Sequence, residues 1–212
     1  MKNDNILLID KLSENKTLFV RDGAEKTFII CLIDKKDQND HRLSVIIKGK
    51  NAKVQILGLI IGQGKQKINL FTLQDHLVQN SVSDLLVKSV LFDSSKFYYE
   101  GLIKIEKNAQ KSNAYQKNQN LLMSANAWAD SRPKLEILAN DVRCTHGVTI
   151  GKIDPEVLYY LKTRGLSEKQ AEHLIIEGFF KDILDRIPDQ KIVDHLTKKI
   201  SKTVVKLLEI KN

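Results

Sequence analysis

The chain has 212 residues, a net charge of +8 at neutral pH and a hydrophobic fraction of 42%, which is ordinary for a globular protein of one or two domains. It contains no apolar run of about 18 residues and no signal-peptide pattern, so we expect no membrane span and a cytoplasmic protein. Two cysteines, Cys31 and Cys144, exclude a disulfide framework and a four-thiolate metal site within one chain, and the scattered lysines match no nucleic-acid-binding motif.

Three short apolar patches, rich in isoleucine and valine, occur within residues 1–50: Ile6–Ile9, Phe28–Ile33 and Leu43–Ile47. Their length and composition predict strands. Asp22-Gly23 predicts a turn that is compatible with a hairpin. The polar segment DKKDQNDHR, which contains His41, is expected to be a loop.

A loose repeat follows, in which strand-like segments open at Val54, Ile68, Val82 and Phe97, at intervals of roughly 14–15 residues. No helical pattern separates these segments, which excludes a doubly wound α/β sheet. A β-sandwich and a β-solenoid both fit, and the period favours the solenoid. A solenoid leaves unpaired strand edges at its ends, which must be capped or paired with another chain.

Residues 97–151 continue the strand pattern. Ile103 and Ile105 alternate with charged residues, as do Leu135 and Ile137, and such alternation is typical of half-buried strands. We therefore expect a mainly β scaffold over residues 1–150.

Helical signals begin after Gly151. Asp154 and Pro155 suit the N-cap and first positions of a helix, and Gly165 suits the position just after its end. Ser167 and Gln170 form a capping-box pattern for a second helix.

Pro188 ends the second helix, and a third begins near Asp189. The expected apolar face of the second is Ala171, Leu174, Ile175, Phe179, Ile183 and Ile187, and that of the third is Ile192, Leu196, Ile200, Val204 and Leu207 or Leu208. Residues 151–212 thus form a small helical domain that must pack on itself, on the strands or on a partner.

Cys144 and His146 are the best candidates for chemistry. In an extended segment the residues i and i+2 point to one side, so this pair could offer a thiolate and an imidazole to one metal. The alternative is that Cys144 is a small buried hydrophobe, and two ligands fall short of a four-ligand site. Cys31, within TFIICLID, is expected to be plain core, and Trp128 is expected to pack on the sheet.

No nucleotide-binding or hydrolase motif is present. The stretch GLIIGQGKQ resembles a phosphate-binding loop but has the wrong spacing, and Gln66 stands where Ser or Thr is required. We therefore expect that this chain binds no nucleotide itself.

Several segments together carry a family resemblance: GLIKIEKNAQKSNAYQKNQNLLMS, PKLEILANDVRCTHGVTIG and DPEVLYYLKTRGLSEKQAEHLIIEGFF. They resemble the C-terminal half of the SufB/SufD family of iron–sulfur cluster assembly proteins over residues 97–188. The SufD-like branch fits better, because the SufB-type cysteine falls on Asn118 and the SufB-type carboxylates fall on Thr145 and Gly147, while the histidine is kept as His146.

The resemblance implies a right-handed parallel β-helix followed by a C-terminal helical domain. It also implies pairing with a SufB-like subunit, or with a second copy, and docking of a SufC-like ATPase on the helices. A transient iron–sulfur cluster between the paired β-helices would take His146 as a ligand, with Cys144 a weaker candidate. Family members are usually about twice this length, so this sequence is either a short natural form, which we expect because it starts with Met, or an excised part of a longer chain.

We therefore expect a non-enzymatic scaffold subunit whose partner-binding residues are Tyr159, Leu161, Leu174, Phe179 and Phe180. Two alternatives stay open. One is a purely structural pairing module without a cluster ligand. The other is a β-helix enzyme, although the sequence offers no cluster of carboxylates for one.

Overall fold

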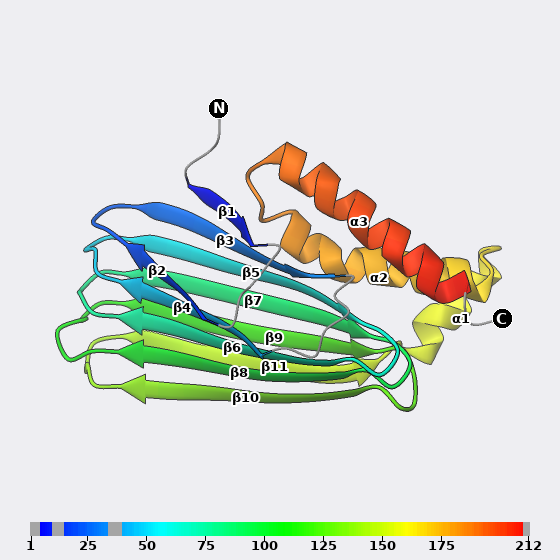
Figure 1. Ribbon diagram of the computed structural model, residues 1–212, viewed down its shortest axis with the longest axis horizontal. Helices are drawn as coiled ribbons and strands as arrows, with labels where there is room; N and C mark the ends of the chain where they lie inside the picture. The colour runs from blue at the N-terminus through cyan, green and yellow to red at the C-terminus, as the bar shows by residue number, and fades with distance from the viewer. Residues whose placement is uncertain (1–4, 10–14, 34–39, 210–212) are drawn as a thin grey trace.

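The computed structural model describes residues 5–9, 15–33 and 40–209, and in them strands are followed by helices (Figure 1). The helices are α1 (Pro155–Thr163), α2 (Glu168–Leu184) and α3 (Gln190–Glu209). The strands are β1 (Ile6–Ile9), β2 (Lys16–Val20), β3 (Glu25–Leu32), β4 (Asp40–Ile47), β5 (Lys53–Gly62), β6 (Lys67–His76), β7 (Val82–Leu91), β8 (Lys96–Ile105), β9 (Asn113–Leu122), β10 (Trp128–Ile137) and β11 (Arg143–Lys152).

Successive strands alternate between two parallel sheets, as in a β-solenoid. One sheet has the order β1-β3-β5-β7-β9-β11, and the other has the order β10-β8-β6-β4-β2. Lys53 lies beside Val82 and Lys67 beside Lys96, so a coil spans 29 residues at these positions. The predicted repeat is therefore half a coil, and the solenoid, rather than the sandwich, is confirmed.

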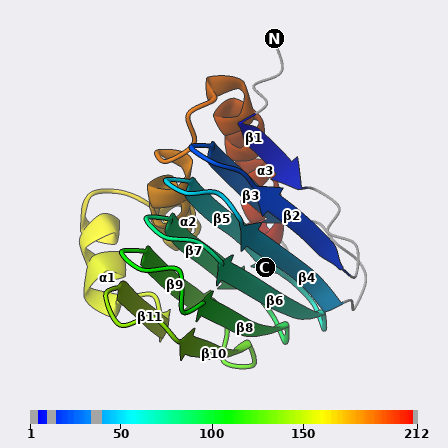
Figure 2. The same ribbon diagram turned by 90° about the vertical axis from the view of Figure 1, so that its left-hand side faces the viewer.

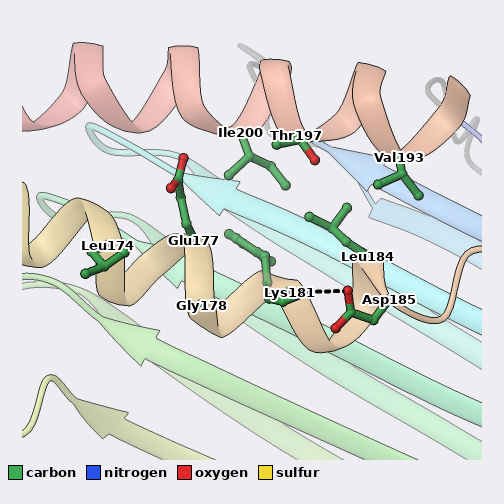
Figure 3. Close-up of a pocket in the computed structure, with 10 residues that line it drawn as sticks. Leu174, Glu177, Gly178, Lys181, Leu184, Asp185, Val193, Thr197 and Ile200 are labelled. Atoms are coloured by element: carbon green, nitrogen blue, oxygen red, sulfur yellow. Dashed lines mark hydrogen bonds and ion pairs between the residues drawn. The ribbon is translucent and has the colours of Figure 1, made fainter. Parts of the chain in front are cut away.

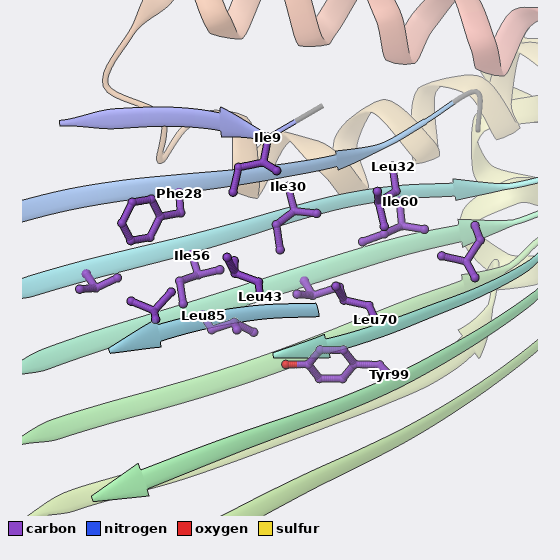
Figure 4. Packing of buried hydrophobic residues seen from close by; sticks show 14 of the residues in the cluster. Ile9, Phe28, Ile30, Leu32, Leu43, Ile56, Ile60, Leu70, Leu85 and Tyr99 are labelled. Carbon is purple, nitrogen blue, oxygen red and sulfur yellow. The ribbon is translucent and has the colours of Figure 1, made fainter. Parts of the chain in front are cut away.

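The interior between the two sheets holds an apolar core in the early coils (Figure 4). Alternate residues of each strand face this interior, and because the ladder is in register they stack in columns from coil to coil. Ile56, Leu85, Leu43 and Leu70 are all within 1% of complete burial. Each such side chain contributes roughly 1.5–3 kcal/mol relative to its exposed state.

One corner of the solenoid is built from stacked left-handed residues. Gly23, Asn51, Asn80 and Lys111 all have φ close to +60° and follow one another by one coil. Glycine and asparagine tolerate this conformation, whereas lysine does not favour it. The predicted turn at Asp22-Gly23 is confirmed, but it is no hairpin, because β2 and β3 belong to different sheets.

The helix boundaries follow the predicted capping signals. The Asp154 carboxylate accepts from the Glu156 amide, and Ser167 and Gln170 form a complete capping box. Helices α2 and α3 lie against the outer face of the six-stranded sheet, as the turned view shows (Figure 2). Residues of β3, β5 and β7 are therefore buried on both faces, which explains their nearly continuous apolar sequences.

A second apolar cluster joins this sheet to the helices and includes Cys31, which is fully buried as expected. The predicted face of α3 is confirmed. The predicted face of α2 is wrong in part: the buried residues of the helix are Ala171, Ile176, Phe180 and Ile183. The run LIIEGFF offers apolar residues at adjacent positions, so periodicity alone could not choose between two faces.

Other expectations need correction. Strand β2 was missed because its apolar run, Leu18–Val20, is only three residues long. His41 lies in β4 rather than in a loop and is only 6% exposed, because its side chain takes an inward position of the ladder. Trp128, which was expected to pack on the sheet, is 45% exposed. No helix within the described ranges is long and apolar enough to cross a membrane.

Candidate functional site

The candidate site is the terminal coil, formed by β10 and β11 (residues 128–152). Each of these strands pairs with a neighbour on one side only, β10 with β8 and β11 with β9. They form the last coil at one end of the solenoid, where both sheets stop (Figure 2). Their inward side chains therefore have no further coil packed on them within the described part of the chain.

The inward side chains of the terminal coil form a mostly apolar mouth. Register places His146 beside Gln116 and Ile150 beside Asn120, both of which are buried interior residues, so the β11 residues also point inward. Ile150 is 45% exposed although it occupies an interior column. The mouth residues are Leu135, Ile137, Cys144, His146, Val148 and Ile150.

Cys144 and His146 lie on one face of β11, as the sequence predicted, but their environments differ. His146 is exposed. Cys144 is partly buried against the apolar cluster that includes Ile105 and Ala114. Burial raises the pKa of the Cys144 thiol, which opposes the thiolate form that a metal would require. Cys144 thus resembles the buried small hydrophobe that was the alternative to a ligand.

A complete metal site is not formed by this chain alone. Across residues 5–9, 15–33 and 40–209, no group of three or more His, Cys, Asp or Glu side chains is placed to hold a metal ion. An exposed imidazole at the mouth can supply one ligand. Any metal or cluster bound there would take its other ligands from another molecule.

Beneath the mouth lies a layer of buried amides that sequence reasoning missed. Gln116, Asn118 and Asn120 of β9 are at most 4% exposed and point inward. Gln116 donates through Nε2 to the Gly101 carbonyl oxygen at 3.2 Å, across the interior. The sequence did contain a signal for this layer. In NAYQKNQNLL, the amides Gln116, Asn118 and Asn120 are two residues apart, in the same phase as the interior residues of the neighbouring strand.

The two open strand edges differ in their hydrogen-bonding capacity. The amides of Trp128 and Leu138 donate toward β8, so the nitrogen of Pro133 lies on the outer edge of β10 and removes a donor there. The Arg143 amide donates toward β9, so those of His146 and Val148 point outward. β11 thus offers an uninterrupted backbone edge, and β10 does not.

The helices present a second surface. Tyr159 is 70% exposed and Leu174 is 48% exposed, and α1 has no buried residue. Leu161 and Phe179 are half-buried. Phe180 is completely buried in the helix–sheet cluster, so the expectation that it contacts a partner is corrected.

A groove of about 360 Å³ lies between α2 and α3 (Figure 3). Its apolar lining includes Leu174, Leu184 and Val193. The Lys181–Asp185 ion pair, at 2.6 Å, lies at its margin.

A cluster of four charges fixes α2 to the sheet. Lys88 of β7 donates to the Phe179 carbonyl oxygen at 2.8 Å and contacts Asp182 at 3.1 Å, and Arg186 contacts both Asp182 and Asp84. Burial lowers the pKa of Lys88, although Asp182 opposes this shift. Burial likewise raises the pKa of Asp84. Removing one member would leave a partly buried charge uncompensated.

Comparisons with known proteins agree with this architecture. Residues 13–179 match the family model described as "SUF system FeS cluster assembly, SufBD core domain". The chain is 31% identical to the iron–sulfur cluster assembly protein SufD of Escherichia coli over 160 residues, which is 76% of this chain and 38% of that protein. It is 34% identical to SufD of Bacillus subtilis over 146 residues, 69% of this chain and 33% of that protein. The chain thus spans about a third of the length of these relatives.

Proposed function

Because the chain belongs to the SufBD family of SUF-system iron–sulfur cluster assembly proteins, we propose that it is a non-enzymatic scaffold subunit that pairs through its terminal coil. The observation that carries the proposal is the open end of the solenoid. At this end the edge of β11 is unpaired and the apolar mouth is exposed, and His146 is exposed beside both. Proteins usually cover such strand edges and apolar surfaces, so their exposure indicates a binding surface.

The proposed partner is a SufB-like subunit that adds a strand to β11. The outward amides of His146 and Val148 would form the backbone ladder, and the apolar mouth would be buried beside it. Pro133 makes β10 the poorer edge for such pairing. Pairing with a second copy of this chain is the other outcome that the experiment below distinguishes.

The cargo of the paired subunits is a nascent iron–sulfur cluster. His146 would supply an imidazole ligand from this side, and the partner would supply thiolates or carboxylates. The protonated, half-buried thiol of Cys144 is a packing residue in this account rather than a ligand.

The helices would dock a SufC-like ATPase. Exposed Tyr159 and Leu174, half-buried Leu161 and Phe179 and the groove between α2 and α3 support this assignment, because apolar anchors beside a groove suit a partner helix. Nucleotide would be bound by the ATPase. A cytoplasmic location stays a prediction.

Native mass spectrometry of the chain mixed with a SufB-like subunit and a SufC-like ATPase tests the pairing. We expect a complex with one copy each of this chain and the SufB-like subunit. Val148→Pro removes an outward amide and should prevent pairing, whereas wild-type Pro133 shows that an edge strand of this coil tolerates proline. A pair of identical chains, or full pairing by the Val148→Pro variant, would contradict the proposal.

The role of His146 is tested by measuring iron and sulfide in the reconstituted complex. We expect His146→Ala to leave the complex intact and to reduce its iron and sulfide content. Unchanged content would favour the alternative, a structural pairing module without a cluster ligand.

A further inference from the structure

Two buried amides, Asn118 and Asn120, hold together strands that do not pair with each other. Both belong to β9, the strand next to the terminal coil, and are 0% and 4% exposed. Asn120 Nδ2 donates to Asn118 Oδ1 at 2.7 Å, so the two side chains form one unit, here called the amide pair.

The amide pair is anchored to the preceding coil through β7. The Ser89 hydroxyl donates to Asn120 Oδ1 at 2.7 Å, and Asn118 Nδ2 donates to the Val87 carbonyl oxygen at 3.1 Å. Ser89 is fully buried. The position of the pair is therefore fixed by a strand that lies deep in the solenoid and is paired on both sides.

From this anchor the pair reaches both strands of the terminal coil. The Ser131 hydroxyl of β10 donates to Asn118 Oδ1, and Asn120 Nδ2 lies 3.2 Å from the Ser131 oxygen. Asn120 Nδ2 also lies 3.3 Å from the carbonyl oxygen of Thr149 in β11. β10 and β11 belong to different sheets, so no backbone ladder sets their relative position.

We propose that the amide pair is the positioning device of the mouth: it fixes the separation and stagger of β10 and β11 and so places His146 and the open edge of β11. Apolar packing between two sheets is non-directional and permits sliding, whereas these hydrogen bonds have defined partners and directions. Buried polar groups that are satisfied in this way specify one arrangement at a cost in stability. The effect on partner pairing rests on the proposed function, whereas the positioning of β10 and β11 by the amide pair does not.

Two matched pairs of substitutions separate positioning from general loss of stability. Asn120→Leu removes an amide of the pair at nearly constant volume, and Gln74→Met does the same to a fully buried amide of β6. Ser131→Ala removes the hydroxyl that joins β10 to the pair. Ser83→Ala removes a hydroxyl that contacts His76 at 2.8 Å, away from the terminal coil.

Hydrogen exchange of backbone amides, measured on the full chain, is the primary readout. Asn120→Leu should speed exchange in 128–137 and 143–152 by about tenfold or more relative to β7, as expected for loss of a buried directional contact. Ser131→Ala should act in the same way but less strongly, mainly in 128–137. Gln74→Met and Ser83→Ala should leave the terminal coil at its wild-type rate.

Affinity for the SufB-like subunit is the second readout. We expect it to fall by about tenfold for Asn120→Leu and to stay unchanged for Gln74→Met. Unchanged exchange in the terminal coil of Asn120→Leu, or equal loosening by Gln74→Met, would overturn the proposal. If Asn120→Leu does not fold, the comparison of Ser131→Ala with Ser83→Ala decides it.

Failure of the proposed function gives a different pattern. If the wild-type chain does not bind a SufB-like subunit, the pairing is wrong, while the exchange data still report whether the amide pair holds the terminal strands. If the wild-type chain binds and Asn120→Leu binds equally well with unchanged exchange, only the positioning role fails.

Discussion

The coil formed by β7 and β8 and the terminal coil have the same strand geometry, but their inward side chains differ in burial. In both, alternate side chains point inward and adjacent strands are in parallel register. Ser89 and Ile103 are completely buried, whereas Ile150 and Leu135, which occupy the same two interior columns, are 45% and 39% exposed. The difference is whether another coil follows, so the exposed apolar residues mark an interior that a partner can complete.

Two histidines show the same contrast. His76 is fully buried, and its ring nitrogens contact the hydroxyls of Ser81 at 2.7 Å and Ser83 at 2.8 Å. His146 is exposed at the mouth. The imidazole of His76 is hydrogen-bonded to buried hydroxyl groups, whereas that of His146 is accessible for binding.

The largest contrast is expected between two glycines. A Cβ at Gly49 would lie 2.0 Å from the carbonyl carbon of Arg21, whereas a Cβ at Gly151 meets nothing within 4 Å. Gly49→Ala should destabilise the fold by about 4 kcal/mol or more, because backbone of a neighbouring coil must move. Gly151→Ala should change stability by less than about 1 kcal/mol. Urea denaturation of both variants measures this, and equal losses would show that the coils are not packed as described.

Large-to-small substitutions should separate the two regions next. Leu85→Ala should cost about 3 kcal/mol, through lost burial and the cavity left behind. Ile150→Ala should cost less than about 1 kcal/mol in the isolated chain, since much of that side chain is already in water. Thermal and urea unfolding provide the measurement, and a large loss for Ile150→Ala would mean that the mouth is closed.

The buried histidine makes stability depend on pH. Burial lowers the pKa of His76 to about 4, below its value of 6.5 in the unfolded chain. The unfolded chain therefore takes up the proton first as the pH falls, so this contribution is complete above pH 6.5 and is lost toward pH 4. The loss should be about 2 to 3 kcal/mol.

His76→Gln should remove this dependence while keeping a hydrogen-bonding side chain. The variant must be compared with the wild type because burial also raises the pKa of Asp75 and Asp84. These two carboxyl groups increase stability as the pH falls, which is opposite to the effect of His76, and they do so in both proteins. The difference between the two stability–pH curves isolates His76. Parallel curves from pH 7 to pH 4 would contradict its buried, neutral state.

The smallest effect is expected at a corner. Lys111 has φ of +60° at a position where the preceding coils use glycine or asparagine. Lys111→Asn should stabilise the chain by about 0.5–1 kcal/mol, because asparagine adopts this conformation at lower cost. Asn80→Lys, at the equivalent place one coil earlier, should destabilise it by a similar amount. Melting temperatures of both variants check the sign.

Much of the fold could be predicted because the relevant signals are local. The spacing of Val54, Ile68 and Val82 reflects half a coil, and Ser167 with Gln170 marks the start of α2 by a local hydrogen-bonded cap. The buried face of α2 could not be predicted, since both Phe179 and Phe180 are apolar and only the sheet beneath decides which is inside. His41 was misassigned for a similar reason, because its polar neighbours concealed an inward ladder position.

The candidate site was predicted in part. The Cys144–His146 spacing placed both side chains on one face, but spacing contains nothing about burial, which separates an exposed imidazole from a half-buried thiol. The amide pair could not be assigned because its partners, Ser89, Ser131 and Thr149, come from three other strands. Pro133 was visible in the sequence, yet its meaning depends on which edge of β10 is open.

The most direct test is amide hydrogen exchange at Cys144, His146, Val148 and Ile150, measured with and without a SufB-like subunit. These amides point away from β9, so they should exchange rapidly in the free chain and become protected when a partner strand is added to β11. If the subunit binds and these four amides keep their free-chain rates, the terminal coil is not the pairing surface.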